Sequence, residues 1–447
     1  MSLSSPSSVA QSTVAPPRAS RREIFAWALY DWANSGYSTL SITLLMSYMT
    51  GVLNHQWGAR YGELAWGWGL GVTMFVAALL SPVLGAVADA QANKRGWLAV
   101  TALAGAAASC LMFLATPDRP TLLFVLFLVA NLGMELSQGF YNAFLPELAD
   151  EHSMGRVSSW GFALGYLGGG LVLLAFLMLY KFAPKFGLPD DDPTSLVPRL
   201  GLLMMGAWWA VFTLPAIIVL RDRGTPRSDS SLVAAARRAV GEVRGTLTNL
   251  RRYRVLVIFL LGFLVFNDGV QTVISQAGVF AKDVLSMDAG ELALVVLMIQ
   301  FIALPGAIVV GWIGDRIGQM HALHLCLAVW TVLLVASFFV NTTAQFWIMS
   351  AVAALVLGGT QSVSRTIMGL MTPEAHTGEF FGFFNLSGKA TSMFGPVVYS
   401  TVFFTTHSAH LAIASLLLFL VVGWAIVSRV DVNAGRREAL KGERPSV

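Results

Sequence analysis

Five ionisable side chains lie within long apolar stretches of the chain: Asp31, Glu135, Asp268, Arg365 and Lys389. A charged side chain at the centre of a bilayer costs about 2.5–3.5 kcal/mol on insertion scales. Left unpaired, five such groups would together oppose insertion by roughly 12–17 kcal/mol, as much as a typical total folding stability. We therefore expect them to pair with one another or to line a wet cavity, where they could bind a polar solute or exchange protons.

Neutral polar residues accompany these charges at helical spacing. Asp31, Asn34 and Ser38 recur at three and four positions and so share one helical face. One stripe on the segment 121–147 steps by four, three and four positions: Asn131, Glu135, Gln138 and Asn142. The remaining candidates stand beside the other charges: Asn267 and Gln271 near Asp268, Gln361 and Ser364 near Arg365, and Asn385 one turn before Lys389.

Each charged group has more than one possible role. Asp31 either takes part in solute or proton binding, or pairs with Arg365 or Lys389 and holds helix ends together. Asp268 is a candidate proton-coupling carboxylate or ammonium ligand, because burial and a nearby cation shift a carboxyl pKa in opposite directions. Arg365 could hold a solute carboxylate bidentately or neutralise Glu135 or Asp268. Lys389 is expected to act in gating or charge balance.

The elements that position these residues are membrane-spanning helices. The chain has 447 residues, of which 55% are hydrophobic and 12% charged, whereas soluble domains average about 25% charged residues. Apolar windows long enough to cross a bilayer number twelve, at roughly 26–53, 64–88, 97–116, 121–147, 158–181, 200–220, 255–281, 291–313, 321–341, 345–371, 380–404 and 409–428. The sequence therefore predicts an all-α polytopic membrane protein with twelve transmembrane helices in two six-helix halves.

The polar segments divide the chain into parts. We expect a disordered cytoplasmic tail (1–25), an N-terminal half (26–220), a basic cytoplasmic linker (221–254), a C-terminal half (255–428) and a cytoplasmic tail (429–447). Most of the 29 Lys and Arg residues fall in the tails, the linker and alternate loops. Such a bias places those segments, and both termini, in the cytoplasm, which favours the plasma (inner) membrane.

The two halves repeat a motif at the end of the second window of each. GAVADAQANKR (85–95) and GWIGDRIGQ (311–319) both place G-x-x-x-D at a turn on the cytoplasmic side, with Asp89 and Asp315 in equivalent positions. Glycine allows close helix approach, and an Asp near a helix end can accept N–H bonds or pair with a base. We expect Asp89, Asp315 and Arg316 to act in gating; ordinary loop capping is the alternative.

The second motif, GWIGDRIG, resembles the cytoplasmic loop signature of the major facilitator superfamily. Four further stretches resemble the branch of autophagy-related vacuolar amino-acid effluxers and their bacterial relatives: YDWANSGY (30–37), FNDGVQTVI (266–274), GGTQSVSRT (358–366) and GEFFGFFNLSGKATSMFGP (378–396). The resemblance implies a twelve-helix transporter fold and suggests amino acids as the solute class. In that fold the first helix of each three-helix unit lines the central path. The windows that correspond to the third helix of each unit contain none of the five buried charged residues.

The expected function is secondary active transport of a small solute by alternating access, driven by protons. Efflux of hydrophobic drug-like or lipid-like molecules and a non-transporting receptor are the alternatives. An enzyme is disfavoured because the polar groups are spread over five windows instead of clustering at one face. The expected partners are the solute, protons and membrane lipids, without nucleic acid, cofactor or metal, and with the chain as a monomer.

Overall fold

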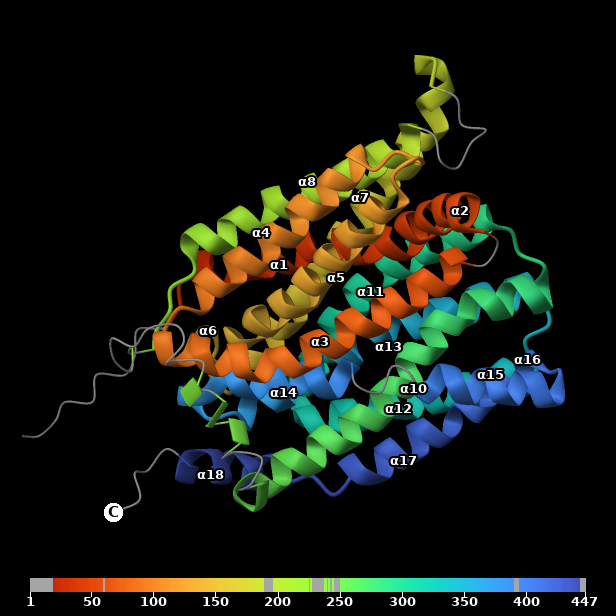
Figure 1. Ribbon diagram of the computed structural model, residues 1–447. Coiled ribbons are helices and arrows are strands. Elements are labelled where there is room, and N and C mark those ends of the chain that lie inside the picture. Colours follow the sequence, from red (N-terminus) through yellow and green to blue (C-terminus); the bar gives the residue numbers. More distant parts are fainter. Residues whose placement is uncertain are drawn as a thin grey trace, which may run out of the picture.

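The structure is a computed structural model that describes residues 19–58, 61–188, 196–224, 226, 237–238, 240–241, 243–244, 250–389 and 394–442. The regular elements of these residues are helices (Figure 1). The predicted all-α fold is confirmed. Residues 1–18 and most of the predicted linker lie outside the described residues.

The N-terminal half contains seven α-helices and one short helix, α6, that continues the fourth window. They are α1 (Arg21–Leu40), α2 (Met46–Trp57), α3 (Tyr61–Gln91), α4 (Lys94–Leu111), α5 (Pro120–Ala143), α6 (Leu145–Leu148), α7 (Met154–Phe182) and α8 (Leu196–Val219). A π-helical segment, Ser41–Leu45, joins α1 to α2. A capping box between Ser20 and Glu23 starts α1 at Arg21, so helix begins inside the segment predicted as a disordered tail.

The C-terminal half follows the same plan. Its helices are α10 (Arg254–Leu285), α11 (Ala289–Ile317), α12 (Gln319–Ala336), α13 (Thr343–Leu370), α14 (Thr377–Lys389), α15 (Phe394–Thr406), α16 (Ala409–Ser415), α17 (Leu417–Val427) and α18 (Val432–Gly442). The last of these, α18, forms within the segment predicted as a C-terminal tail.

Ten helical segments of the described chain are long and apolar enough to cross a membrane. The other two predicted windows, 26–53 and 380–404, are also helical, but their helices are shorter or more polar. Four charged residues, including Asp31, lower the hydropathy of α1, and the window 380–404 is divided between α14 and α15, around residues 390–393, which lie outside the described part.

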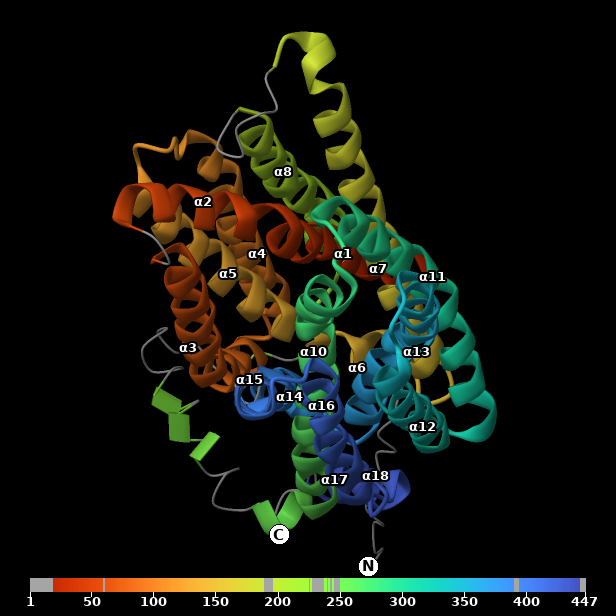
Figure 2. The ribbon, with the colours of Figure 1, turned by 90° about the vertical axis from the view of Figure 1, so that its right-hand side faces the viewer.

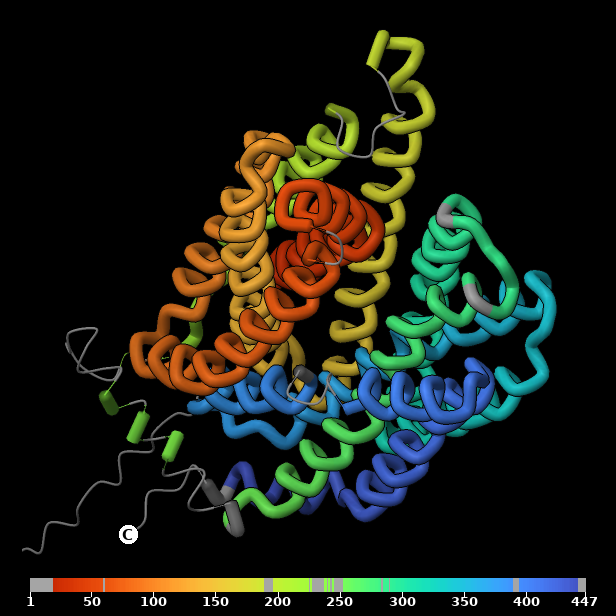
Figure 3. Tube along the Cα trace, turned by 45° about the vertical axis from the view of Figure 1, so that its right-hand side comes forward, coloured from red at the N-terminus to blue at the C-terminus, as the bar shows by residue number. Residues whose placement is uncertain are grey.

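Each half has its own apolar core. The buried residues of one cluster run from Trp27 to Leu220. Those of the second run from Tyr253 to Val430, with Ala143 as the one member contributed by the N-terminal half. Figures 2 and 3 show the two groups of helices, red to yellow-green and green to blue, as separate bundles that meet along one side.

The bundle has two ends. We call one of them the terminal face (left in Figure 1). Helices α1, α4, α7, α10 and α14 begin there, and α3 and α11 end there, with α18 beside them. The opposite face carries the ends of α2, α10 and α15. The sequence-predicted polar residues are positioned between these two faces and at the terminal face.

Candidate functional site

A buried arginine joins the two halves. Arg365, on α13, is only 1% exposed, and its polar partners lie in the N-terminal half. Its Nη1 lies 3.5 Å from the Asp31 carboxylate on α1 and donates to Asn142 Oδ1 on α5 at 3.2 Å. Its Nε donates to Ser158 Oγ on α7 at 3.0 Å, and its Nη2 donates to the Ser158 carbonyl at 2.6 Å. Each of the three guanidinium nitrogens therefore contacts a protein group in this conformation.

Aromatic rings of the N-terminal half enclose the same guanidinium. Its carbon lies 4.9 Å, 5.3 Å and 4.1 Å from the ring centroids of Trp27, Tyr141 and Phe162. The Tyr141 hydroxyl donates to Asp31 Oδ2 at 2.9 Å. An ion pair so far from water is stable only with such additional bonds. The structure shows the pair with Arg365 that was one alternative for Asp31, whereas Asp268 bonds to Gly395.

Neutral amides lie next to this ion pair. Asn34 Nδ2 donates to Gln138 Oε1 and thereby links α1 to α5. Asn34 is 2% exposed, and its Oδ1 is buried without a hydrogen-bond partner. At the next residue of α5, a Cβ placed on Gly139 would lie 2.9 Å from Asn385 Nδ2. The glycine therefore lets α14 of the C-terminal half approach α5 closely, and the Asn385 Nδ2 is itself buried and unpartnered.

The polar stripe on α5 does not act as one surface. Asn131 donates to Thr73 on α3, Gln138 accepts from α1, and Asn142 accepts from Arg365 on α13. Glu135 lies among them and is buried. The stripe therefore makes polar contacts with three different helices, α3, α1 and α13.

The cluster predicted around Asp268 lies within the C-terminal half. Asp268 is 1% exposed, and its Oδ2 accepts the N–H of Gly395 on α15 at 2.9 Å. Asn267 donates to the carbonyl of Gly388 on α14 at 3.2 Å, and Gln271 is half-buried. The two bonded groups tie α10 to α14 and α15. Lys389 is the last residue of α14, and its side chain lies outside the described part of the chain.

Further polar contacts between the halves involve residues of α7, α11 and α13. Tyr166 donates to Gln361 Oε1 at 3.1 Å, and Ser159 Oγ lies 2.8 Å from Ser362 Oγ. Gln300 Nε2 donates to Thr39 Oγ1 at 2.6 Å. The interface is thus hydrogen-bonded along much of its length.

The first G-x-x-x-D turn binds the other half directly. Asp89 accepts the backbone N–H of Gly378 at 3.0 Å and of Glu379 at 3.1 Å, at the start of α14. The N-terminus of a helix carries unpaired N–H groups and partial positive charge, which favour a carboxylate. A Cβ on Gly85 would lie 2.1 Å from the Gly378 carbonyl oxygen, so only glycine permits this approach.

Lys94 completes this contact. Its Nζ donates to Thr377 Oγ1 at 2.8 Å across the interface, forms an ion pair with Glu147, and lies 3.8 Å from Asp89. Lys94 is 3% exposed. We call Asp89, Lys94, Glu147 and the first turn of α14 the α14 latch.

The second G-x-x-x-D turn makes a weaker contact. Asp315 Oδ2 lies 3.7 Å from Nε of Arg156 on α7, whose side chain is 69% exposed. Gln319, on the same side as Asp315, donates to its Oδ1 at 3.2 Å. Arg316 lies over Trp312 of its own helix, with 3.7 Å between the guanidinium carbon and the ring centroid. This contact of Arg316 lies within α11, and the gating role expected for Arg316 stays a prediction.

The C-terminal helix also bridges the halves at the terminal face. Arg436 of α18 forms an ion pair with Glu151, in the loop between α6 and α7. Glu438 accepts the Val255 N–H at 3.1 Å and so anchors α18 to the start of α10.

Sequence reasoning missed several of these residues. Tyr141, Ser158 and Gln300 are ordinary polar residues of apolar helices, and nothing in their spacing marks them. Lys94 offered a clearer signal, since it stands within the repeated segment GAVADAQANKR at a helix end. Within the described residues, no cluster of three or more His, Cys, Asp or Glu side chains is arranged to hold a metal ion.

Comparison with known proteins identifies the family. The model of the vacuole effluxer Atg22-like family matches residues 69–440. The chain is 28% identical over 407 residues to the uncharacterized MFS-type transporter YxiO of Bacillus subtilis, covering 91% of this chain and 94% of that protein. It is 25% identical over 311 residues to autophagy-related protein 22-1 of Penicillium rubens, covering 64% of this chain and 50% of that protein, so the match spans about half of that relative.

Solved structures agree on the fold. The proton:xylose symporter XylE bound to 6-bromo-6-deoxy-D-glucose, a major facilitator superfamily protein, superposes with a TM-score of 0.68 at 14% identity, covering 94% of this chain and 98% of that one. The predicted resemblance is confirmed. The chain therefore belongs to the Atg22-like vacuole effluxer family, within the major facilitator superfamily of transporters.

Proposed function

We propose that this chain moves a small polar solute across a membrane by alternating access, with its two halves rocking against each other as the interface that contains the Asp31–Arg365 pair opens and closes. The observation that carries the proposal is the contrast between the cores and the interface. Each half encloses its own apolar core, whereas hydrogen bonds and ion pairs cross between the halves.

Such an interface can exchange its contacts at small net cost. A hydrogen bond contributes about 0.5–1.5 kcal/mol net, or about 1.5–3 kcal/mol when one partner is charged. Two conformations that differ by a few kcal/mol can be interconverted by a solute that binds one of them better. Rigid apolar cores would preserve each half while the interface opens.

The contacts at the terminal face support an assignment of conformational state. The α14 latch, the Asp315–Arg156 pair and the Arg436–Glu151 pair all hold that face together. The distribution of Lys and Arg supports the cytoplasm as the compartment it faces. We therefore assign this structure to a state closed toward the cytoplasm, in a plasma or inner membrane with both termini inside.

For the solute we propose amino acids. The family description names vacuole effluxers. Asn34, one turn from Asp31, has an unpartnered acceptor, and Asn385, which approaches Gly139 of α5, has an unpartnered donor. A zwitterion needs both kinds of partner. Arg365 could bind the solute carboxylate only by exchanging it for Asp31, so we assign Arg365 first to the interface.

For coupling we propose that a proton on Asp31 releases Arg365 and loosens the interface. Asp268 is the second candidate carboxylate, since its Oδ1 is buried without a hydrogen-bond partner. Its contacts lie within one half, so its protonation would act on the packing of α10 against α15. Neutral Asn at each position mimics the protonated state.

The test is counterflow of labelled amino acids into proteoliposomes containing the purified chain, at several pH values. Asp31→Asn and Asp268→Asn are compared with Asp118→Asn, whose side chain is 72% exposed at the opposite face. We expect saturable exchange in the wild type and the Asp118 variant, and a loss of pH dependence in the Asp31 variant. Unchanged pH dependence in both interior variants would exclude them from coupling, and the absence of exchange for every amino acid would exclude the solute class.

A further inference from the structure

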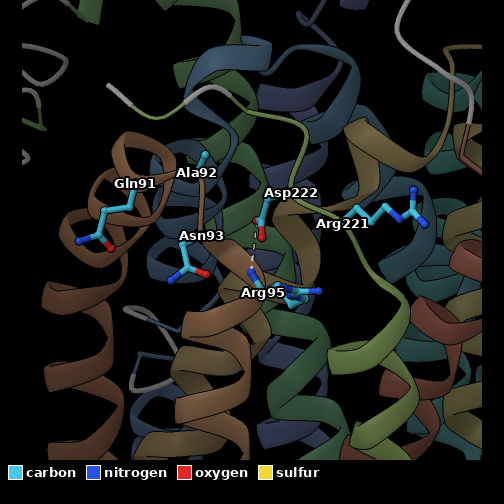
Figure 4. Close-up of a pocket in the computed structure, with 6 residues that line it drawn as sticks. All are labelled: Gln91, Ala92, Asn93, Arg95, Arg221 and Asp222. Atoms are coloured by element: carbon cyan, nitrogen blue, oxygen red, sulfur yellow. Dashed lines mark hydrogen bonds between the residues drawn. The ribbon is translucent and has the colours of Figure 1, made fainter. Parts of the chain in front are cut away.

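A cavity of about 680 Å³ opens on the terminal face, beside the α14 latch and outside the interface between the halves. Its lining comes from the turn between α3 and α4, the first turn of α4 and the chain that follows α8: Gln91, Ala92, Asn93, Arg95, Arg221 and Asp222. Figure 4 shows Asp222 between that turn and Arg221, with its carboxylate directed at the backbone N–H of Arg95. We propose that this cavity binds the phosphate of an anionic phospholipid headgroup.

The hydrogen-bonding groups left over in the cavity are mainly donors. Gln91 Oε1 accepts from Trp97 Nε1 at 3.1 Å, and Asn93 Oδ1 accepts the Gly96 N–H at 3.1 Å. Asp222 Oδ1 accepts the Arg95 N–H at 3.3 Å. These internal bonds occupy one acceptor position on each of the three side chains, and the amide NH₂ groups and most guanidinium N–H groups stay available to a ligand. A ligand that fits must be rich in acceptors, as a phosphate is.

The charges of the lining point to the same chemistry. Arg95 and Arg221 outnumber the single carboxylate of Asp222. One guanidinium nitrogen of Arg95 donates to the Leu220 carbonyl at 3.3 Å, which holds the group in place and leaves its other donors available. Arg221 is exposed and makes no hydrogen bond or ion pair with another described residue. Arginine binds phosphate with two parallel N–H bonds.

The position of the cavity favours a lipid over a soluble phosphate. It lies where α4 begins and α8 ends, at the level expected for headgroups, and basic pockets between transmembrane helices at this level bind anionic lipids. On the same two helices, Val100 is 66% exposed and Ile218 is 72% exposed. These apolar side chains offer a surface for acyl chains, which a free phosphate lacks.

The bound lipid would act on the latch. The chain that lines the cavity continues into Arg223, whose N–H donates to Glu147 Oε2 at 3.3 Å, and Arg95 follows Lys94 directly. A phosphate that bridges Arg95 and Arg221 would hold this segment against α4. We expect it to stabilise the latched arrangement.

The test measures the thermal midpoint of the detergent-purified chain while phosphatidylglycerol or phosphatidylcholine is titrated into the micelles. The variant Arg95→Gln/Arg221→Gln is compared with Arg429→Gln/Arg437→Gln, which removes two exposed charges from the same face in the other half. Because a hydrogen bond to a charged group contributes about tenfold in affinity, loss of the two arginine–phosphate contacts should weaken phosphatidylglycerol binding by roughly a hundredfold. The control variant should respond as the wild type does.

Two results would overturn the proposal. The first is an equal response of the cavity variant and the control to phosphatidylglycerol. The second is stabilisation by inorganic phosphate, dependent on the same arginines, with no response to the lipid; this would assign the cavity to a soluble anion. Should the double variant fail to fold, Arg221→Glu serves in its place, since it breaks no bond between described residues and should abolish the lipid response.

Discussion

Replacing Arg365 with methionine tests whether the buried ion pair holds the halves together at the terminal face. Methionine keeps much of the side-chain volume but removes the bonds to Asp31, Asn142 and Ser158. Breaking a buried pair by removing one partner costs about 3–5 kcal/mol, because the other charge remains buried. The polar partners of Arg365 all lie in the N-terminal half. The lost free energy therefore destabilises mainly the arrangement in which the two halves are closed, and the apolar core of each half less.

A loss of that size changes the ratio of closed to open molecules by more than about a hundredfold. Spin labels at His152 and Arg429, both exposed at the terminal face but in different halves, would report it by double electron–electron resonance. The background replaces the two native cysteines, Cys110 and Cys326. We expect one short distance in the wild type and a new, longer distance in Arg365→Met.

The double variant Asp31→Asn/Arg365→Met provides the control. It removes the stranded carboxylate, so its distance distribution should return part of the way toward that of the wild type. Suppose instead that Arg365→Met lowers the thermal midpoint while the distances stay unchanged. Then the arginine supports the fold in general, and the assignment of its bonds to the closed interface is wrong.

Three further predictions concern the α14 latch; the first two use the same labels, and the third uses denaturant titration. Gly85→Ala should open the terminal face, because the added Cβ would lie 2.1 Å from the Gly378 carbonyl oxygen. Gly67→Ala is the control, since its Cβ would have no atom within 4 Å. Equal label-to-label distances in the two variants would contradict the argument from close approach. Asp89→Ala leaves two N–H groups of α14 unpaired and should cost the closed state about 1–3 kcal/mol, measured as the shift in label populations. Lys94→Met leaves the Glu147 carboxylate without its cation and should lower the free energy of unfolding by about 3–5 kcal/mol, measured by denaturant titration. An unchanged free energy of unfolding would contradict the role given to Lys94.

The sequence alone was sufficient to predict the class, the fold and the need for pairing. Hydropathy over a window is a local property, so the apolar segments could be located without knowing their neighbours, apart from where α1 begins and where the window 380–404 is divided. The repeat of Asp89 and Asp315 was visible for the same reason. The cost of burying charge required partners for Asp31 and Arg365 before any partner could be named.

Only the tertiary structure decided which groups meet. Arg365 pairs with Asp31, far away in the sequence, and Asp268 bonds within its own half. The two equivalent turns also differ: Asp89 binds the start of α14, whereas Asp315 faces an exposed arginine and Arg316 stacks on Trp312. Helical periodicity fixes the face on which a side chain lies. The partner depends on how distant helices pack against that face, and local sequence spacing carries no information about that packing.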